Sequence, residues 1–206
     1  MRSAIALALI GVAGLAILAQ SALATDSTGS GNVGAEEGSF PIDPSFANDV
    51  QSIPPDMPTA TRSSPAVPVR LKALEGFSSR PYADPAGQTK TYSIGYGYQI
   101  RPGETFTTID TATANVLLDK VIAEIDAYLP GMLAVPVTQN QYDALVLFAY
   151  NVGRGAFASS TMLRRLNSGD YAAAAAEFPR WVKAGNITLP ALVARRADEQ
   201  QLFMTV

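Results

Sequence analysis

The chain has 206 residues, of which 48% are hydrophobic and 16% are charged, and its formal net charge is −3. These proportions are typical of a globular protein with room for one domain and additional segments. Because the sequence contains no cysteine and no histidine, thiol nucleophiles, disulfides, Cys/His zinc sites and Ser-His-Asp catalysis are excluded. Carboxylates, hydroxyls, Lys, Arg and Tyr remain for any chemistry.

Residues 1–24 have the pattern of an export signal. Arg2 precedes an apolar run from Ala4 to Ala19, and the segment ends in Ala22-Leu23-Ala24, a small-x-small cleavage pattern. The run is slightly shorter than the ~20 residues that span a bilayer, so we expect either a cleaved signal peptide or a retained, releasable membrane anchor. Either alternative exports the rest of the chain to the periplasm or the cell exterior, or tethers it to the membrane.

Residues 25–66 are predicted to form a flexible linker, because Ser, Thr, Gly, Pro and Asp dominate and no apolar period is sustained. The linker is acidic, since residues 25–69 carry six acidic residues against Arg62 alone. Residues 70–206 carry thirteen Lys/Arg and twelve Asp/Glu. This near-neutral balance gives no electrostatic basis for nucleic-acid binding, and we expect none.

Residues 67–206 are predicted to form one α+β domain, mostly helical with a small β-hairpin lobe. A short helix ends around Glu75-Gly76, and a hairpin-like stretch follows from Lys90 to Ile100. Thr108 is the expected N-cap of the next helix, with Asp110 in its first turn, and a capping box formed by Thr138 and Gln141 opens a buried central helix. The apolar periods predict further helices over residues 160–166, 171–181 and 190–203.

The hairpin-like stretch alternates aromatic or apolar residues with small ones. Gly95 and Gly97 leave one strand face nearly bare, so another backbone or a flat ligand can approach it. The tyrosines at 82, 92, 96 and 98 are able to stack on sugar rings, although alternate strand residues are more often core. Phe178 and Trp181, at helical spacing, are expected to pack in the core.

Two carboxylates flank this stretch, Glu75 and Asp84. Glu75 ends an apolar helix, where partial burial favours the protonated form that an acid catalyst needs. Asp84 lies in a turn-forming segment, Tyr82 to Gly87, where solvent keeps it ionised. Two carboxylates in unlike environments suit glycoside hydrolysis, but spacing alone favours the ordinary alternative of a solvated helix end and a turn residue.

The ordered motifs of residues 70–204 favour the catalytic interpretation of Glu75 and Asp84 over this ordinary alternative. Glu75-Gly76, Tyr82-x-Asp84 and Ser93-Ile94-Gly95-Tyr96-Gly97 resemble the catalytic segment of phage lysozymes of glycoside hydrolase family 24, the group that contains the T4-type enzyme. The matches continue in the same order through Asn140–Leu145, Phe148–Gly153, Ser160–Arg164, Leu166–Tyr171, Phe178–Trp181 and Arg195–Glu199.

The resemblance implies a lysozyme-like fold and roles for three residues. Glu75 takes the place of the general acid, Asp84 that of the second carboxylate, and Ser93 that of a hydroxyl that holds the attacking water, where the family usually has Thr. We expect Tyr82, Tyr96, Gly95 and Gly97 to bind substrate.

Two further observations concern side chains that pair with acidic residues. Many relatives have His where this chain has Tyr98, which removes an expected partner of an acidic residue and should affect stability more than chemistry. Arg195 and Arg196 are both possible partners of Glu75.

The implied activity is that of a muramidase, which cleaves the β-1,4 bond between N-acetylmuramic acid and N-acetylglucosamine in peptidoglycan glycan strands. It would serve phage host-cell lysis or wall penetration, act as a monomer and need no cofactor or metal, and inversion is implied by analogy with the T4-type enzyme. The alternative is a catalytically inactive peptidoglycan-binding or structural virion module that keeps the fold, which Ser93 and Tyr98 favour.

Overall fold

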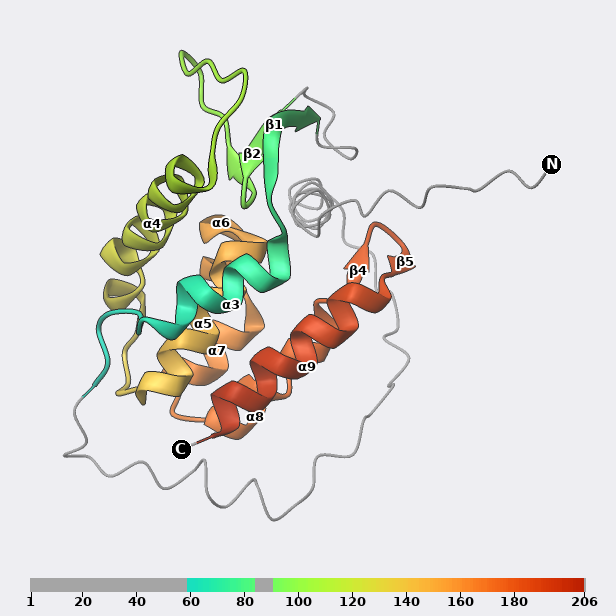
Figure 1. Cartoon of the computed structure of the whole chain (residues 1–206). Helices are drawn as coiled ribbons and strands as arrows, with labels where there is room; N and C mark the ends of the chain where they lie inside the picture. Colours follow the sequence, from blue (N-terminus) through green and yellow to red (C-terminus); the bar gives the residue numbers. More distant parts are fainter. Residues whose placement is uncertain (1–58, 84–90, 206) are drawn as a thin grey trace.

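A computed structural model describes residues 59–83 and 91–205 (Figure 1). The predicted signal or anchor, most of the predicted linker, and both Asp84 and Lys90 lie outside the described residues. Within the described ranges, no helix has the length and apolar character needed to cross a membrane. The predicted fold class is confirmed, because the domain is mostly helical and a small antiparallel sheet lies at one end of it (Figure 1).

The sheet contains three antiparallel strands in the order β1-β2-β3. They are β1 (Ser78–Ala83), β2 (Tyr92–Gly95) and β3 (Tyr98–Gln99). The sequence predicted β2 and β3 within the hairpin-like stretch but not β1, which contains Pro81 and shows no clear alternation of apolar residues. Gly95 ends β2 and Gly97 lies in the turn to β3, with φ values of 66° and 93°.

Helix α4 (Thr111–Tyr128) joins this sheet to the rest of the domain. Its first half packs through Ala114 and Leu117 on Ile94 and Tyr98 of the sheet, forming a small apolar cluster. Its second half contributes Leu118, Ile122 and Ile125 to the main core. The N-cap is Asp110, whose side chain accepts a hydrogen bond from the Thr113 amide at 2.7 Å, and not Thr108 as predicted.

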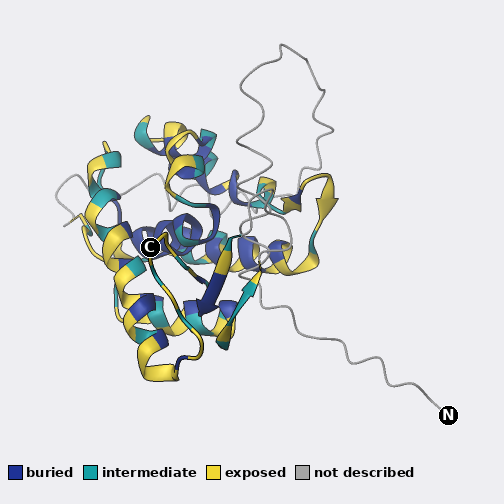
Figure 2. Cartoon of the chain, turned by 90° about the horizontal axis from the view of Figure 1, so that it is seen from above, coloured by how far each residue is buried: buried dark blue, intermediate teal, exposed yellow. Residues whose placement is uncertain are grey.

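Helix α5 (Gln139–Val152) is the centre of the main core, and nearly every residue along it is buried (Figure 2). The predicted capping box is confirmed: the Gln141 amide donates to Thr138 Oγ1 at 3.2 Å, and the Thr138 amide donates to Gln141 Oε1 at 2.9 Å. This cap satisfies amides that would otherwise lack partners at the start of a buried helix. Helices α3 (Ala66–Glu75), α4 and α9 (Pro190–Met204) all pack against α5.

Short helices and strands make up the rest of the described chain. The predicted helix over residues 171–181 is wrong: α8 ends at Ala175, and a separate 3-10 helix, η2, contains Pro179, which has no amide to continue an α-helix. The expected packing of Phe178 and Trp181 is confirmed, since both rings meet Phe148 edge to face. The short elements of this region are η1 (Pro130–Met132), α6 (Arg154–Ala158), α7 (Thr161–Asn167), α8 (Tyr171–Ala175), η2 (Phe178–Arg180), β4 (Lys183–Ala184) and β5 (Ile187–Thr188).

Residues 60–64 run along the domain before α3 begins. The Ala60 amide donates to the Val137 carbonyl at 3.0 Å, Ser63 Oγ donates to Asp126 at 2.7 Å, and the Ser64 amide donates to Asp143 at 2.9 Å. These contacts begin N-terminal to residue 67, where the sequence places the start of the domain. The division into signal, linker and domain stays a prediction.

Candidate active site

Glu75 is the last residue of α3 and lies where the helices meet the sheet (Figure 1). Gly76 follows with a φ of 68°, a conformation that glycine adopts without steric cost, and this turn directs the chain into β1. The Glu75 side chain is 1% exposed. Burying a carboxyl group this deeply is costly to the fold unless a partner forms a hydrogen bond or ion pair with it.

Arg195, from α9, supplies that partner. Its Nη1 donates to Glu75 Oε1 at 2.6 Å, and its own side chain is 1% exposed. The structure therefore distinguishes between the two predicted partners, because only Arg195 among the described residues forms an ion pair with Glu75. The other oxygen, Glu75 Oε2, has no hydrogen-bond partner among the described residues and is shielded from solvent.

Arg195 belongs to a larger buried group of charges on α9. Arg195 Nε and Arg196 Nη2 both donate to Glu199 Oε1 at 3.0 Å, and Arg196 Nη2 also donates to Asn151 Oδ1 at 2.9 Å. Burial lowers the pKa of Arg196 to about 10, although Glu199 opposes the shift. Burial would also lower the pKa of Arg195, but Glu75 and Glu199 together raise it. The sequence analysis missed Glu199, although its spacing of four and three residues from the two arginines is that of helical ion pairs.

Tyr150, from α5, connects this group to the sheet. Its hydroxyl donates to the Tyr96 carbonyl at 2.8 Å. Burial raises the pKa of Tyr150 strongly, and the nearby Glu75 raises it further. The Tyr96 ring also contacts the Phe77 ring, with centroids 5.7 Å apart. Tyr150 and Phe77 therefore fix the hairpin turn beside the end of α3. Tyr150 lies within the motif Phe148–Gly153, but the sequence assigned neither residue a role in the site.

The predicted hydroxyl residue, Ser93, lies in β2 directly opposite Tyr82 of β1. Directly opposed residues of antiparallel strands point to the same sheet face. Ser93 is buried and Tyr82 is partly exposed. The neighbouring residue Ile94 points instead into the apolar cluster with α4, so Ser93 and Tyr82 lie on the sheet face away from α4.

The two predicted glycines have structural reasons of their own. A Cβ at Gly95 would lie 3.1 Å from Ala114 Cβ, so this glycine allows α4 to approach the sheet closely. Gly97 provides the positive φ of the turn. Contact of either glycine with substrate stays a prediction.

Asp84 lies outside the described residues, so its separation from Glu75 stays a prediction. A cavity of about 650 Å³ lies elsewhere, between residues 61–68 and α4, and none of the predicted site residues that the structure describes lines it. Within the described ranges, no three acidic side chains gather in an arrangement that would hold a metal ion.

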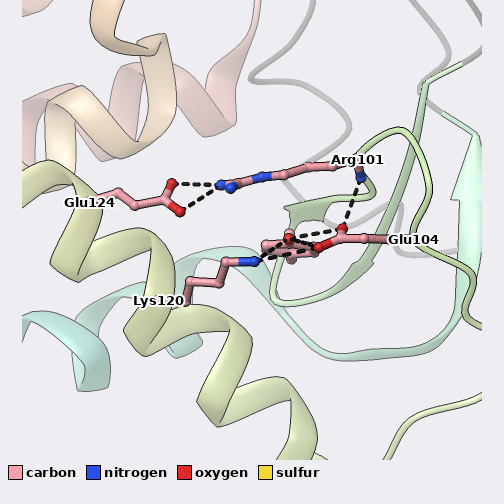
Figure 3. Close-up of polar contacts among 5 residues, drawn as sticks. Arg101, Glu104, Lys120 and Glu124 are labelled. Carbon is pink, nitrogen blue, oxygen red and sulfur yellow. Dashed lines mark hydrogen bonds and ion pairs between the residues drawn. The ribbon is translucent and has the colours of Figure 1, made fainter.

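The expectation that Tyr98 removes a partner of an acidic residue is wrong. The Tyr98 hydroxyl donates to Glu104, at 2.7 Å from Oε1, and accepts from Lys120 Nζ at 3.0 Å. Figure 3 shows Glu104 between Lys120 and the backbone of Arg101, while the Arg101 side chain pairs with Glu124. The Arg101 amide, the Tyr98 hydroxyl and Lys120 hold the pKa of Glu104 below its usual value. These contacts link the hairpin to α4.

Comparison with known proteins matches this arrangement to one family. Residues 72–199 match the family model described as phage lysozyme. The chain is 46% identical over 136 residues to an endolysin of Bacillus phage PZA, covering 65% of this chain and 51% of the relative. It is 35% identical over 132 residues to a SAR-endolysin of Bacteriophage PS119, covering 64% of this chain and 77% of the relative.

Among solved structures, the muramidase domain of SpmX from Asticaccaulis excentricus superposes with a TM-score of 0.63 and 32% identity, covering 70% of this chain and 99% of that domain. The chain spans about half the length of the Bacillus phage endolysin. The family model covers more than half of this chain, and its range contains Glu75, Ser93, Arg195 and Glu199. The chain therefore belongs to the phage lysozyme family.

Proposed function

We propose that this chain is a muramidase that hydrolyses the β-1,4 bond between N-acetylmuramic acid and N-acetylglucosamine, with Glu75 as the general acid. The observation that carries the proposal is the environment of Glu75: Arg195 fixes Oε1, while Oε2 is left without a hydrogen-bond partner among the described residues. A carboxyl group held by one oxygen has a fixed orientation, and the other oxygen is free to carry the proton that is transferred.

The reaction requires a proton for the departing sugar and a water molecule for the anomeric carbon. Glu75 Oε2 gives its proton to the glycosidic oxygen as the carbon–oxygen bond breaks, and water attacks the opposite face. Asp84 accepts a proton from that water, and the Ser93 hydroxyl helps to hold it. The Ser93 assignment is supported by its place on the sheet face away from α4. The product would have inverted configuration at the anomeric carbon.

Substrate has to reach a carboxyl group that is buried here. Because Oε2 is shielded from solvent, the proposal requires the surface beside Glu75 to open before the glycosidic oxygen can approach. Partly exposed aromatic rings near the hairpin, Tyr82 and Tyr96, are suited to stack on the apolar faces of the sugars. Gly95 and Gly97 would allow the strand to come close to the glycan.

We infer export through the N-terminal segment, as a cleaved signal or a retained anchor, to reach the wall in host-cell lysis or wall penetration. The relatives named endolysin and SAR-endolysin support this use, and residues 1–24 supply the apolar segment. The chain would act as a monomer on peptidoglycan glycan strands. Sequencing the N-terminus of the exported protein tests the two alternatives, because a start at Thr25 indicates cleavage.

The activity is tested with purified peptidoglycan by release of reducing ends. The wild-type chain should release them, and Glu75→Gln should abolish release while circular dichroism and melting temperature show that it remains folded. Glu177→Gln is a matched control, because Glu177 is also buried and pairs with two arginines, Arg165 and Arg180. If Glu75→Gln kept full activity, the role of Glu75 would be wrong. Binding to insoluble peptidoglycan without release of reducing ends would support the inactive-module alternative, which the names of the relatives do not favour.

A further inference from the structure

Glu199 is a buried carboxylate that the proposed reaction does not use. Its side chain is 1% exposed, and Oε1 accepts hydrogen bonds from both Arg195 and Arg196 at 3.0 Å. A buried charge of this kind is costly to a fold unless it is paired. Glu199 contacts Arg195, and Arg195 contacts Glu75. This connection suggests a role for Glu199 in the site.

The first part of that role is geometric. Arg195 uses all three nitrogens of its guanidinium: Nη1 donates to Glu75 at 2.6 Å, Nη2 to the Leu147 carbonyl at 3.2 Å, and Nε to Glu199 at 3.0 Å. These acceptors come from α3, α5 and α9, so the planar group is fixed from three directions. Without Glu199, the Nε edge of Arg195 has no carboxylate to orient it.

The second part is electrostatic. Two arginines and two glutamates, all nearly inaccessible to solvent, form the group, so the charges cancel when both carboxylates are ionised. Two guanidinium donors on one oxygen favour the ionised form of Glu199, although burial raises its pKa. If Glu199 were neutral, the two arginines would act on Glu75 without opposition and would favour its ionised form. An acid catalyst has to hold a proton at the working pH.

No other described group that interacts electrostatically with Glu75 supplies the negative charge of Glu199. Tyr150 on α5 interacts electrostatically with Glu75 and also with Tyr82 on β1, but burial keeps the Tyr150 phenol neutral. Among the charged groups that act on Glu75 from α9, Arg195 and Arg196 are positive, and Glu199 is the negative group.

We propose that Glu199 is a positioning residue of this site: it orients Arg195 against Glu75 and offsets the positive charge of Arg196, so that removing either charge changes the ionisation of Glu75. The catalytic part of this inference rests on the proposed function, whereas the effect on Glu75 ionisation does not.

The experiment follows the ionisation of the Glu75 carboxyl by NMR of full-length chain carrying ¹³C-labelled glutamate, with the Glu75 signal assigned from its loss in Glu75→Gln. Glu199→Gln keeps the shape and removes the negative charge, so Glu75 should ionise about one pH unit lower. Arg196→Met removes a positive charge, so Glu75 should ionise at higher pH. The double variant should return toward wild type, and Glu177→Gln should leave the titration unchanged.

The same variants are then assayed for release of reducing ends from peptidoglycan across pH. The alkaline limb of the profile should move down by about one pH unit in Glu199→Gln and up in Arg196→Met. A structural role alone would lower activity by the same factor at every pH and leave the limb in place. The proposal is overturned if Glu199→Gln and Arg196→Met leave the Glu75 titration unchanged or move it in the same direction.

Failure of the proposed function gives a different result. If the wild-type chain releases no reducing ends, the muramidase proposal fails, while the NMR titration still decides the effect of Glu199 on Glu75. If Glu199→Gln alone does not fold, comparison of the double variant with Arg196→Met decides it, because these two differ only in the charge of residue 199.

Discussion

The close approach of α4 to the sheet at Gly95 allows a stability prediction worked from two separate costs. Gly95 has a φ of 66°, and a Cβ placed there would lie 3.1 Å from Ala114 Cβ and 3.4 Å from Ile109 Cδ1. Alanine in this conformation costs about 1 to 2 kcal/mol. Overlap in a packed core costs about 1 to 3 kcal/mol more, and the reduced freedom of the unfolded chain offsets about 0.4 to 1 kcal/mol. Gly95→Ala should therefore lower the free energy of unfolding by about 1 to 4.5 kcal/mol, which lowers Tm by roughly 3 to 15 °C.

Two other glycines separate these costs. Gly169 has a φ of 82° but no atom within 4 Å of an added Cβ, so Gly169→Ala carries only the conformational cost. Gly131 has neither a positive φ nor a close neighbour, and Gly131→Ala should change stability by less than about 0.5 kcal/mol. Chemical unfolding followed by circular dichroism gives all three values. Ala114→Gly should partly rescue Gly95→Ala, with a coupling energy of about 1 kcal/mol in a double-mutant cycle. Equal losses in Gly95→Ala and Gly169→Ala, without coupling to Ala114, would refute the argument from close packing.

Three further predictions concern the helices. Thr138→Ala removes the cap of α5 and should lower the free energy of unfolding by about 1 kcal/mol in urea denaturation, whereas a variant as stable as wild type would show that the capping box contributes nothing. Phe148→Ala removes a buried ring that meets three other aromatic rings and should cost about 3 to 5 kcal/mol, against less than about 0.5 kcal/mol for the exposed control Val116→Ala. Burial raises the pKa of the Tyr128 phenol from 10.0 to about 12, so its neutral form stabilises the folded state below pH 10 and this contribution is lost as the pH rises through about 12. Tyr128→Phe should therefore reduce the fall in the free energy of unfolding between pH 10 and pH 12. An unchanged fall would contradict the raised pKa.

The features that were predicted correctly depend on neighbours close in sequence. The capping box of α5 needs only Thr138 and Gln141, three positions apart. The N-cap of α4 was misplaced because Thr108 and Asp110 are both good capping residues, and hydrogen bonding to the Thr113 amide distinguishes them.

The features that were missed depend on contacts between distant segments. Strand β1 exists because it pairs with β2, and its own residues include a proline and a polar run. Arg195 and Arg196 are adjacent in sequence, and only the packing of α9 against α5 determines which of them reaches Glu75 at the end of α3. The roles of Tyr150 and Glu199 likewise depend on the meeting of α5 and α9 with the end of α3.

The charges buried between these helices need an explanation other than stability. A buried ion pair gains little over apolar residues of the same size, because desolvation offsets the attraction between the charges. The apolar contacts beside the group already hold α9 in place: Phe203 meets Phe178, and Phe178 meets Phe148 of α5. Apolar residues at 195, 196 and 199 would leave α9 packed but Glu75 buried without a partner. The charged group on α9 therefore fits the role that we propose for Glu75, a general acid that has to be shielded and oriented.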